Sequence, residues 1–450
     1  MTDLIFSFDT EDYINYDITD DIIKVAQLLR KNGIKGCYQT VGLMAEALVE
    51  WGRQDVIEEL SKYHEIGLHS HRHTMHPTID EYTDLSDFDL ALELFLEDES
   101  IGLDKLRRVF GIEGQLTSAC PPGDSTSYVA HYGYSKMGFP IYTGDHLYDA
   151  RRNRPIYSCN IASLEYNYSM EKLLFTANEE SLKQFIEEKI VPRDVYVLYN
   201  HPQRVTCVTY PDLENFYREN TPKDKWKLTA HHTAEEVATF YRNLETLIDL
   251  VKNDPRINIT TYSELARKIK SERKITRDML PDLKKQLDEY FFPVTAPDSF
   301  CIADIFHACA DFLLGKEAHE CGDVYGFLDT PYSVEKPTTL SADEVRYIAG
   351  RIKKDRFLPE FYLVDDKKVG PADWLRAALA VLVDGAESYT VEPCGQWQID
   401  MDQFPALRDL NYKGCWCHCD SLEDRYLSKR FRLQSWTFRL PKGTERKIFY

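Results

Sequence analysis

The chain has 450 residues and a formal net charge of −20, with 43% hydrophobic and 28% charged residues. This length is sufficient for two or three domains, and the composition is ordinary for a globular protein. The excess of acidic residues argues against nucleic acid or an anionic membrane as the main partner.

Signals that would direct the chain to or across a membrane are missing from the sequence. No apolar run approaches the roughly 18–20 residues that a membrane span requires. No basic region followed by an apolar core marks a secretory signal. The sequence as it stands therefore predicts a cytoplasmic protein, and an extracellular or cell-wall location is expected only if a leader is missing from it.

Eleven cysteines are scattered along the chain. Because their number is odd and the chain is too large to need covalent staples, we expect reduced thiols. Cys415, Cys417 and Cys419 alternate, which suits one face of a β-strand. They lack the two separated pairs from which a structural zinc site usually draws its ligands, so the sequence favours the strand.

Strands and helices alternate through the first 270 residues, beginning with a buried apolar strand at Leu4–Phe8. The spacing predicts an α/β fold in which a parallel sheet or barrel is covered by helices. The expected strands are 4–8, 34–41, 65–68, 116–119, 139–142, 194–199 and 257–261. The expected helices are 20–31, 46–63, 85–109, 125–134, 234–252 and 264–270.

Chemically active residue types gather where these strands end. Asp9, Glu11 and Asp12 follow the first strand, and His69 and His73 follow the third. Active sites of parallel α/β folds are built at this end of the strands. Two histidines four residues apart on a helical turn face the same way, as two ligands of one metal must. The sequence therefore favours a metal site over a polar loop.

Two further strand ends point to the same edge of the sheet. The sequence CPPGD at 120–124 is expected to form a stiff turn, because its two prolines lock the backbone. His201 ends the strand at 194–199, and Pro202 stops the chain behind it. Four strand ends therefore converge on one candidate site.

The order of these motifs resembles that of the polysaccharide deacetylase family, the carbohydrate esterases of the NodB-homology type. The resemblance covers roughly residues 1–270, and its most specific part is the block around the paired histidines. The resemblance implies a distorted (β/α)7 barrel, with its site at the C-terminal ends of the strands. The motifs are SFDTED at 7–12, GIKGCYQTVG at 33–42, HEIGLHSHRH at 64–73, CPPGD at 120–124 and VLYNHP at 197–202.

The resemblance implies a divalent metal held by His69, His73 and one carboxylate. Glu11 stands where the family places that carboxylate, although Asp12 could take the role. Two histidines and one carboxylate leave open positions for water and substrate. Zinc is the expected metal, and cobalt, manganese or iron would suit the same ligands.

The resemblance also implies how the reaction would run. Asp9 would be the general base, and His201 the general acid that protonates the leaving amine. Asp145 is the expected partner that orients the catalytic histidine. The substrate would be an N-acetylated (N-acylated) amino sugar or glycan. The residues expected to contact it are Pro122, Gly123 and Asp124.

The sequence departs from the family after its fourth strand. The family usually has an arginine there that pairs with the catalytic aspartate, and Cys120 occupies its place. Asp9 therefore needs another partner. The candidates are Arg72, Arg151, Arg152 and Arg154. This departure suggests a divergent member with an unusual substrate.

Two other functions remain open from the sequence. One is the hydrolysis of a small non-peptide C–N amide, as in the allantoinase branch of the same fold, which can work without metal. The other is a catalytically silent carbohydrate-binding module. Retention of both His69 and His73 counts against the first, and the presence of Asp9 and His201 counts against the second.

A second domain is expected after the barrel. The stretch 271–285 is dominated by charge and is interpreted as a linker. Residues 286–450 form an expected α+β accessory domain that would bind substrate or support a homo-oligomer. Its expected helices are 302–314, 342–353 and 371–383, and its expected strands are 361–365 and 396–400.

Overall fold

The computed structural model describes residues 1–450 except 124, 145, 271, 396–398, 400–403, 405–409, 411, 413–414 and 447–450. Contacts divide the chain into two compact units. The first unit contains residues 1–154, 163–270 and 411–427, and the second contains 155–162, 271–410 and 428–450. The chain therefore passes between the units more than once, and residues near its C-terminus belong to the first unit.

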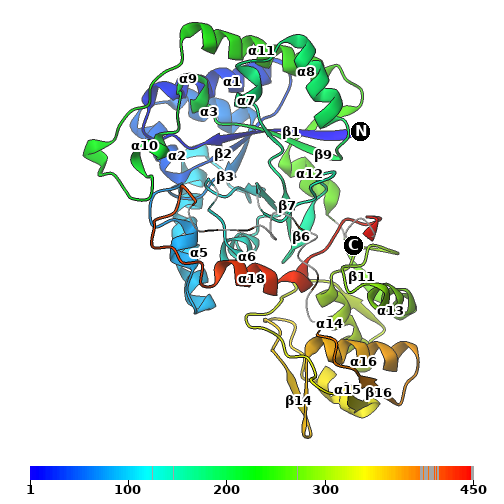
Figure 1. Cartoon of the computed structure of the whole chain (residues 1–450). Helices are drawn as coiled ribbons and strands as arrows, with labels where there is room; N and C mark the ends of the chain where they lie inside the picture. The colour runs from blue at the N-terminus through cyan, green and yellow to red at the C-terminus, as the bar shows by residue number, and fades with distance from the viewer. Residues whose placement is uncertain are drawn as a thin grey trace. The chain divides into compact units, whose positions relative to one another are not determined.

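The first unit is a mixed α/β structure built on a curled sheet of parallel strands, with helices packed around it (Figure 1). The central strand β1 pairs with β2 through Ser7–Thr10 and with β9 through Asp3–Phe8. The strand order is β5-β4-β3-β2-β1-β9-β8, and β10 pairs with the beginning of β1. All nine residues of β1 are buried, as expected of a parallel strand covered on both faces.

The elements of the first unit have the following bounds. The strands are β1 (Thr2–Thr10), β2 (Cys37–Thr40), β3 (Glu65–Leu68), β4 (Ser118–Ala119), β5 (Ile141–Thr143), β8 (Tyr168–Ser169), β9 (Val195–Asn200) and β10 (Ile257–Thr260). The helices are η1 (Tyr16–Ile18), α1 (Thr19–Lys31), α2 (Gly42–Glu50), α3 (Gln54–Tyr63), α4 (Ile79–Thr83), α5 (Phe88–Phe110), α6 (Tyr128–Lys136), α7 (Glu171–Leu174), α8 (Glu179–Phe185), η2 (Ile186–Ile190), α9 (Gln203–Thr206), α10 (Pro211–Asn215), η3 (Lys223–Lys225), α11 (Ala234–Lys252) and α12 (Tyr262–Ile269).

Each strand expected from the sequence has a counterpart in this sheet, whereas the closed (β/α)7 barrel stays a prediction. The helix expected at 46–63 is two helices, α2 and α3. Gly52 separates them with a φ of +67°, a backbone conformation that ends a helix. The sequence predicts no element between 143 and 194, where the structure has β6 (Ile156–Ser158), β7 (Ile161–Leu164), β8, α7, α8 and η2.

The described residues of the second unit form an α+β structure with small antiparallel pairs of strands: β11 with β12, β13 with β16, and β14 with β15. Its core holds Trp374 against Phe306, with ring centroids 4.7 Å apart. Its elements are β6 (Ile156–Ser158), the beginning of β7 (Ile161–Leu164), β11 (Lys274–Thr276), η4 (Arg277–Met279), α13 (Leu280–Glu289), α14 (Ile302–Leu313), β12 (Ala318–Glu320), β13 (Thr338–Ser341), α15 (Ala342–Ala349), β14 (Tyr362–Val364), β15 (Lys367–Val369), α16 (Pro371–Val383), β16 (Ser388–Val391), α18 (Leu427–Leu433) and η6 (Ser435–Thr437).

The stretch interpreted as a charged linker carries regular structure. Residues 271–285 include β11, η4 and the first part of α13. The reason is that Ile275, Leu280 and Leu283 are buried and anchor these elements, although charged residues surround them in sequence. The strand expected at 396–400 falls on residues that, except for Ile399, lie outside the described part of the chain.

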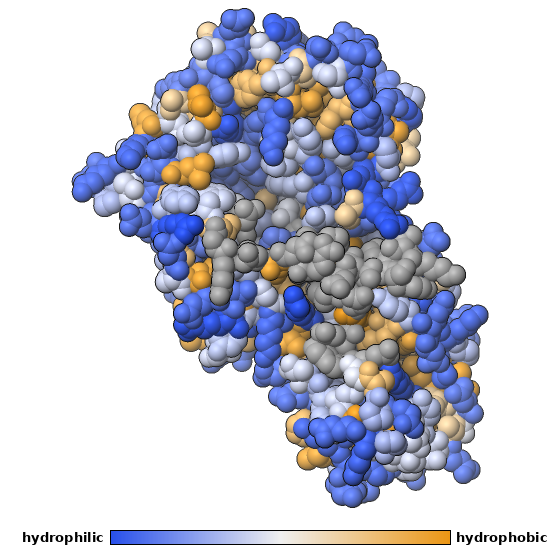
Figure 2. Space-filling model, in the orientation of Figure 1, coloured by the Kyte–Doolittle hydropathy of each residue, from blue (hydrophilic) through white to orange (hydrophobic). Residues whose placement is uncertain are grey.

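The surface seen in Figure 2 is mostly hydrophilic, with apolar residues in small groups, in keeping with the acidic composition. Among the described residues, no helix is both long enough and apolar enough to span a membrane.

Candidate functional site

A cavity of about 500 Å³ lies in the first unit, at the C-terminal ends of β1, β3, β4 and β9. This is a volume typical of small-molecule sites. The residues that line it include carboxylates, histidines and aromatic rings. They are Asp9, Glu11, His69, His73, Cys120, Pro121, Gly123, Gly144, Tyr166, Lys172, Tyr199, His201, Tyr210, Asp212, Leu213 and Trp416.

Glu11, His69 and His73 converge on one point of this cavity. Oε2 of Glu11 lies 3.1 Å from Nε2 of His69 and 3.0 Å from Nε2 of His73. All three side chains are at most 5% exposed. Burial alone would raise the pKa of Glu11, but His73 and His201 hold it well below its ordinary value. Glu11 is therefore an anion that faces two imidazole nitrogens.

The two histidines meet through a loop and not through the helical turn that their spacing suggests. Residues 69–76 are not helical, and Ser70 and His73 have φ angles of +63° and +56°. These left-handed conformations are unfavourable for residues with a side chain, so the surrounding contacts must hold them. One such contact is the 3.0 Å hydrogen bond that the backbone N–H of His73 donates to Oγ of Ser70.

Each of these three side chains has a second contact that fixes its orientation. Nδ1 of His69 lies 3.3 Å from the carbonyl oxygen of Cys120, and Nδ1 of His73 lies 2.8 Å from Oδ2 of Asp212. In a neutral imidazole whose proton is on Nδ1 and faces an acceptor, Nε2 carries the free lone pair. In both histidines this lone pair points toward Glu11. Gln203 donates a 2.7 Å hydrogen bond to the other oxygen of Glu11.

This arrangement fits a divalent metal. Both ring nitrogens of His73 are buried, and each faces a carboxylate oxygen, Nδ1 that of Asp212 and Nε2 that of Glu11. Three ligand atoms within 4.8 Å of one another, each from a buried residue, could hold one ion. The outer contacts are those of metal-ligating histidines in general, whose free N–H meets a carbonyl or carboxylate.

Asp12 does not take part in this group. Its side chain accepts hydrogen bonds from the backbone N–H groups of Ile14 and Asn15 and from the Asn15 amide, at 2.8–2.9 Å. Burial raises the pKa of Asp12 to about 7 in spite of these bonds. Its role is to hold the turn after β1, so Glu11 is the carboxylate that faces the histidines.

Asp9 and His201 lie on another side of the same cavity, with Oδ2 of Asp9 3.5 Å from Nε2 of His201. Burial raises the pKa of Asp9, while His69 and His201 oppose that shift. Nδ1 of His201 lies 2.7 Å from Oε1 of Glu171. Burial alone would lower the pKa of His201, but the carboxylates of Glu11 and Glu171 raise it to about 9.

The sequence leaves open which residue accompanies Asp9, and no described contact joins it to Arg72, Arg152 or Arg154. Arg72 pairs with Asp98, Arg152 with Asp194 and Arg154 with Asp149, while Arg151 is exposed. The hydroxyl of Tyr166 instead donates a 2.8 Å hydrogen bond to Oδ1 of Asp9. Among the described residues, a tyrosine and a histidine therefore provide the polar contacts of Asp9 where the sequence suggests a guanidinium.

The turn after β4 reaches the cavity in part. Pro121 and Gly123 line it, whereas Pro122 does not. Gly123 has a φ of +58°, and a Cβ there would lie 3.0 Å from Cζ2 of Trp416. Asp124 and Asp145, which the sequence also suggests as site residues, lie outside the described residues.

Several site residues have no signal in the sequence motifs. Tyr166, Glu171 and Asp212 sit in or beside short elements of two to five residues, where periodicity carries no information. Trp416 comes from near the C-terminus. The chemistry of the site predicts that a carboxylate lies near each histidine. The sequence does not show which carboxylate that is.

No protein-family model and no curated protein sequence matches the chain. Solved structures give weak likenesses. A putative polysaccharide deacetylase from Mycobacterium smegmatis is 13% identical, with a TM-score of 0.40 over 60% of this chain and 90% of that one. A 4-alpha-glucanotransferase from Thermococcus litoralis is 12% identical, with a TM-score of 0.41 over 64% and 46%. A CE4 family pseudoenzyme from Bacillus anthracis is 10% identical, with a TM-score of 0.28 over 44% and 54%. Likeness at this level says nothing about what this chain does.

Proposed function

We propose that the protein is a metal-dependent hydrolase that removes an N-acetyl or related N-acyl group from an amino sugar or glycan. The observation that supports this most is that two sets of groups face one cavity. One set, Glu11, His69 and His73, suits a divalent metal, and the other, Asp9 and His201, suits proton transfer. The five sequence motifs occur in the order of the deacetylase family and point the same way.

The metal would be held by Nε2 of both histidines and by the Glu11 carboxylate, and zinc suits these donors best. When bound, such a metal supplies Lewis acidity, which lowers the pKa of water and polarises an amide carbonyl. The Asp212 carboxylate and the Cys120 carbonyl would keep the two imidazoles in the tautomer that binds metal.

The chain's own residues would move the protons. Asp9 is the general base that takes a proton from the attacking water, and Tyr166 holds its carboxylate in place. His201 is the general acid that gives a proton to the leaving nitrogen. The Glu171 carboxylate favours the protonated form of His201 that this role requires.

A sugar suits the remaining walls of the cavity. Tyr166, Tyr199, Tyr210 and Trp416 line it, and aromatic rings offer both apolar faces and polar edges. Lys172 adds a hydrogen-bond donor at the same wall.

The direct test is release of acetate from N-acetylglucosamine oligosaccharides by zinc-loaded protein, with allantoin as the competing small-amide substrate. We expect acetate release that falls about 10²–10⁴-fold in Asp9→Asn and His201→Gln, the usual contribution of general acid–base groups. His231→Gln, at an exposed histidine, is the matched control and should keep full activity. If the protein hydrolyses allantoin and not the oligosaccharide, its substrate is a small amide and not a sugar. Binding of the oligosaccharide without acetate release would indicate a silent module.

A further inference from the structure

A second group of metal-ligating side chains lies in the first unit, apart from the three that face the cavity. The Sγ atoms of Cys415 and Cys417 are 3.4 Å apart. With a ring nitrogen of His418, these ligand atoms all lie within 4.8 Å of one another. We call Cys415, Cys417, His418 and the neighbouring Asp80 the Cys/His cluster.

The strand expected at 415–419 is not present, and that prediction is wrong. Residues 415–419 form a turn, in which the backbone N–H of His418 donates a 3.3 Å hydrogen bond to the carbonyl of Cys415. In a strand the side chains of neighbouring residues would point to opposite faces. The turn instead brings those of Cys415, Cys417 and His418 together.

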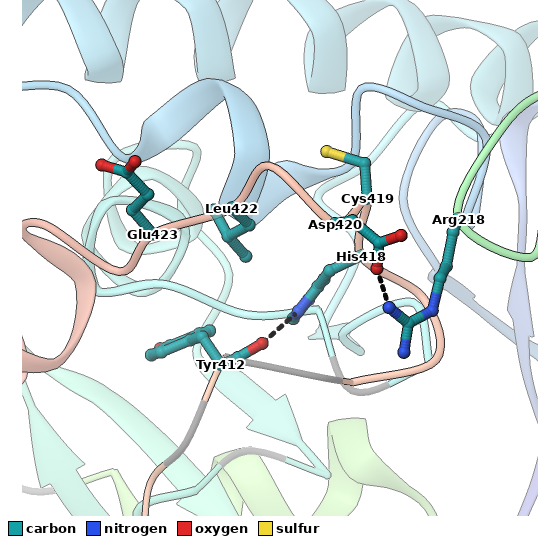
Figure 3. A pocket seen from close by; sticks show the side chains of 7 residues that line it. All are labelled: Arg218, Tyr412, His418, Cys419, Asp420, Leu422 and Glu423. Atoms are coloured by element: carbon teal, nitrogen blue, oxygen red, sulfur yellow. Dashed lines mark hydrogen bonds and ion pairs between the residues drawn. The ribbon is translucent and has the colours of Figure 1, made fainter.

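The imidazole of His418 is oriented as metal-ligating histidines are. Its Nδ1 donates a 2.9 Å hydrogen bond to the carbonyl oxygen of Tyr412 (Figure 3). A carbonyl can only accept, so Nδ1 carries a proton and Nε2 is free to offer a lone pair. His418 is only 3% exposed, and its Nε2 makes no hydrogen bond.

Asp80 brings a fully buried carboxylate to this nitrogen. Its Oδ2 lies 2.5 Å from Nε2 of His418, so the carboxylate and the imidazole form a buried pair. Two lone-pair atoms in such contact repel each other unless a cation, either a proton or a metal ion, neutralises them. A buried carboxylate is costly unless it is paired or binds a metal.

We propose that the Cys/His cluster binds a second divalent metal ion, with zinc as the preferred ion. Two thiolates and one imidazole are donor types from which tetrahedral zinc sites are built. Asp80 would take the fourth position only after its carboxylate moves away from Nε2 of His418. The edge of a tetrahedron with Zn–S bonds of about 2.3 Å is about 3.8 Å. The 3.4 Å between the two sulfur atoms is close to this value. Binding releases the two thiol protons to solvent.

The proposed ion has a structural role that reaches the catalytic cavity. Trp416 stands between the two cysteines in sequence and lines the cavity that also contains Glu11 and His73. Its ring packs over Gly123, where a side chain would collide with it. Metal bound by Cys415 and Cys417 fixes the backbone on both sides of Trp416, and therefore holds the indole at the cavity wall.

The first test counts metal in untagged full-length protein loaded with zinc and freed of excess. We expect two zinc ions per chain in the wild type and one in Cys415→Ser/Cys417→Ser. The control is Cys419→Ser, which removes a thiol from the same turn. Sγ of Cys419 lies 3.1 Å from Oγ of Ser421, and its side chain points away from His418 in Figure 3. Cys419→Ser should keep both ions, and loss of one ion there would contradict the assignment.

The second test identifies the ligands in the wild type, so that it stands even if the double variant fails to fold. X-ray absorption at the zinc edge should show sulfur at about 2.3 Å. Cobalt-loaded protein should show sulfur-to-cobalt charge transfer that Cys415→Ser/Cys417→Ser abolishes. Charge transfer that survives in this variant would come from Cys120 in the cavity and would contradict the proposal. Zinc without sulfur ligands would overturn the proposal, as would a disulfide between Cys415 and Cys417 found by mass spectrometry. Either result would leave a protonated His418–Asp80 ion pair and would not affect the catalytic proposal.

Discussion

At the scale of single residues, the carboxylate of Glu171 contacts His201 and favours its protonated form. Its Oε1 lies 2.7 Å from Nδ1 and also accepts a 2.6 Å hydrogen bond from the backbone N–H of His201. Burial opposes a positive charge on His201, but Glu11 and Glu171 together raise its pKa to about 9. A general acid must be protonated, so activity should fall as the pH rises through the pKa of His201, which the Glu171 carboxylate raises.

Glu171→Gln should move the alkaline limb of the kcat profile to lower pH. Glutamine keeps a hydrogen-bond acceptor but removes the negative charge, so the pKa of His201 falls and the acid form is lost earlier. We expect a shift of about one pH unit or more, equivalent to ~1.4 kcal/mol. The profile of kcat against pH measures it, and an unchanged limb in an active variant would exclude His201 as the acid.

Asp212 is a positioning residue for the proposed metal, because it contacts Nδ1 of His73 and not the ion itself. Asp212→Asn should weaken zinc binding at the histidine site by about 10–100-fold, the usual effect of removing such a partner. Glu214→Gln, at an exposed position of the same helix α10, is the matched control. Chelator competition measures both affinities, and equal values would contradict the role of Asp212.

At the scale of elements, β3 places His69 and depends on the absence of a side chain at Gly67. A Cβ there would overlap the amide of Gln39 and lie 2.6 Å from Oγ of Ser118. These two side chains are buried and joined by a 2.8 Å hydrogen bond, so they cannot move away easily. The sheet next to the histidine loop therefore needs glycine at this point.

Gly67→Ala should lower the free energy of unfolding by about 1–3 kcal/mol, as overpacking of a core usually does. Adding Gln39→Ala makes room for the new methyl group, so the double variant should lose less than the sum of the single variants. Chemical denaturation of the four proteins measures this coupling. Strict additivity would show that the cost of Gly67→Ala comes from elsewhere.

The sequence predicts the longer elements of the first unit well, for a physical reason. Helices such as α1 and α11 bury one face, and this leaves a periodic pattern of apolar residues. The strand ends at Asp9, His69 and His201 follow from the same patterns. The loop that joins His69 to His73 could not be predicted, because its two positive φ angles depend on tertiary contacts.

At the scale of the whole molecule, residues near the C-terminus belong to the first unit, and the local pattern of apolar residues does not predict this. The backbone N–H of Cys419 donates a 2.5 Å hydrogen bond to Glu81, a residue 338 positions earlier. Asp84 accepts hydrogen bonds from the backbone of Arg425 and Tyr426. These contacts attach residues 419–426 to the region of α4, and such long-range pairing leaves no periodic trace in the sequence.

Residues near the C-terminus also contribute to the core of the second unit. Trp436 is fully buried, and its ring lies 5.0 Å from Phe327 and 5.7 Å from Phe306, centroid to centroid. Trp436→Ala should lower the free energy of unfolding of this unit by about 3–5 kcal/mol. Tyr347→Ala, at an exposed aromatic residue of the same unit, should change it little. Urea denaturation measures both, and a small effect at Trp436 would contradict its place in the core.

The account depends most on the metal that Glu11, His69 and His73 are proposed to bind. The decisive measurement is the zinc dissociation constant of this site, obtained by chelator competition in a Cys415→Ser/Cys417→Ser background. We compare His73→Ala with His71→Asn, because His71 stands two residues away but contacts Asp98 and Lys105.

His73→Ala removes a direct ligand and should weaken zinc binding by more than the ~100-fold that loss of an outer partner can cost. His71→Asn should leave the affinity within a few-fold of the parent. Tight zinc binding that survives His73→Ala, or that His71→Asn abolishes to the same extent, would contradict the proposed site and the hydrolase built on it.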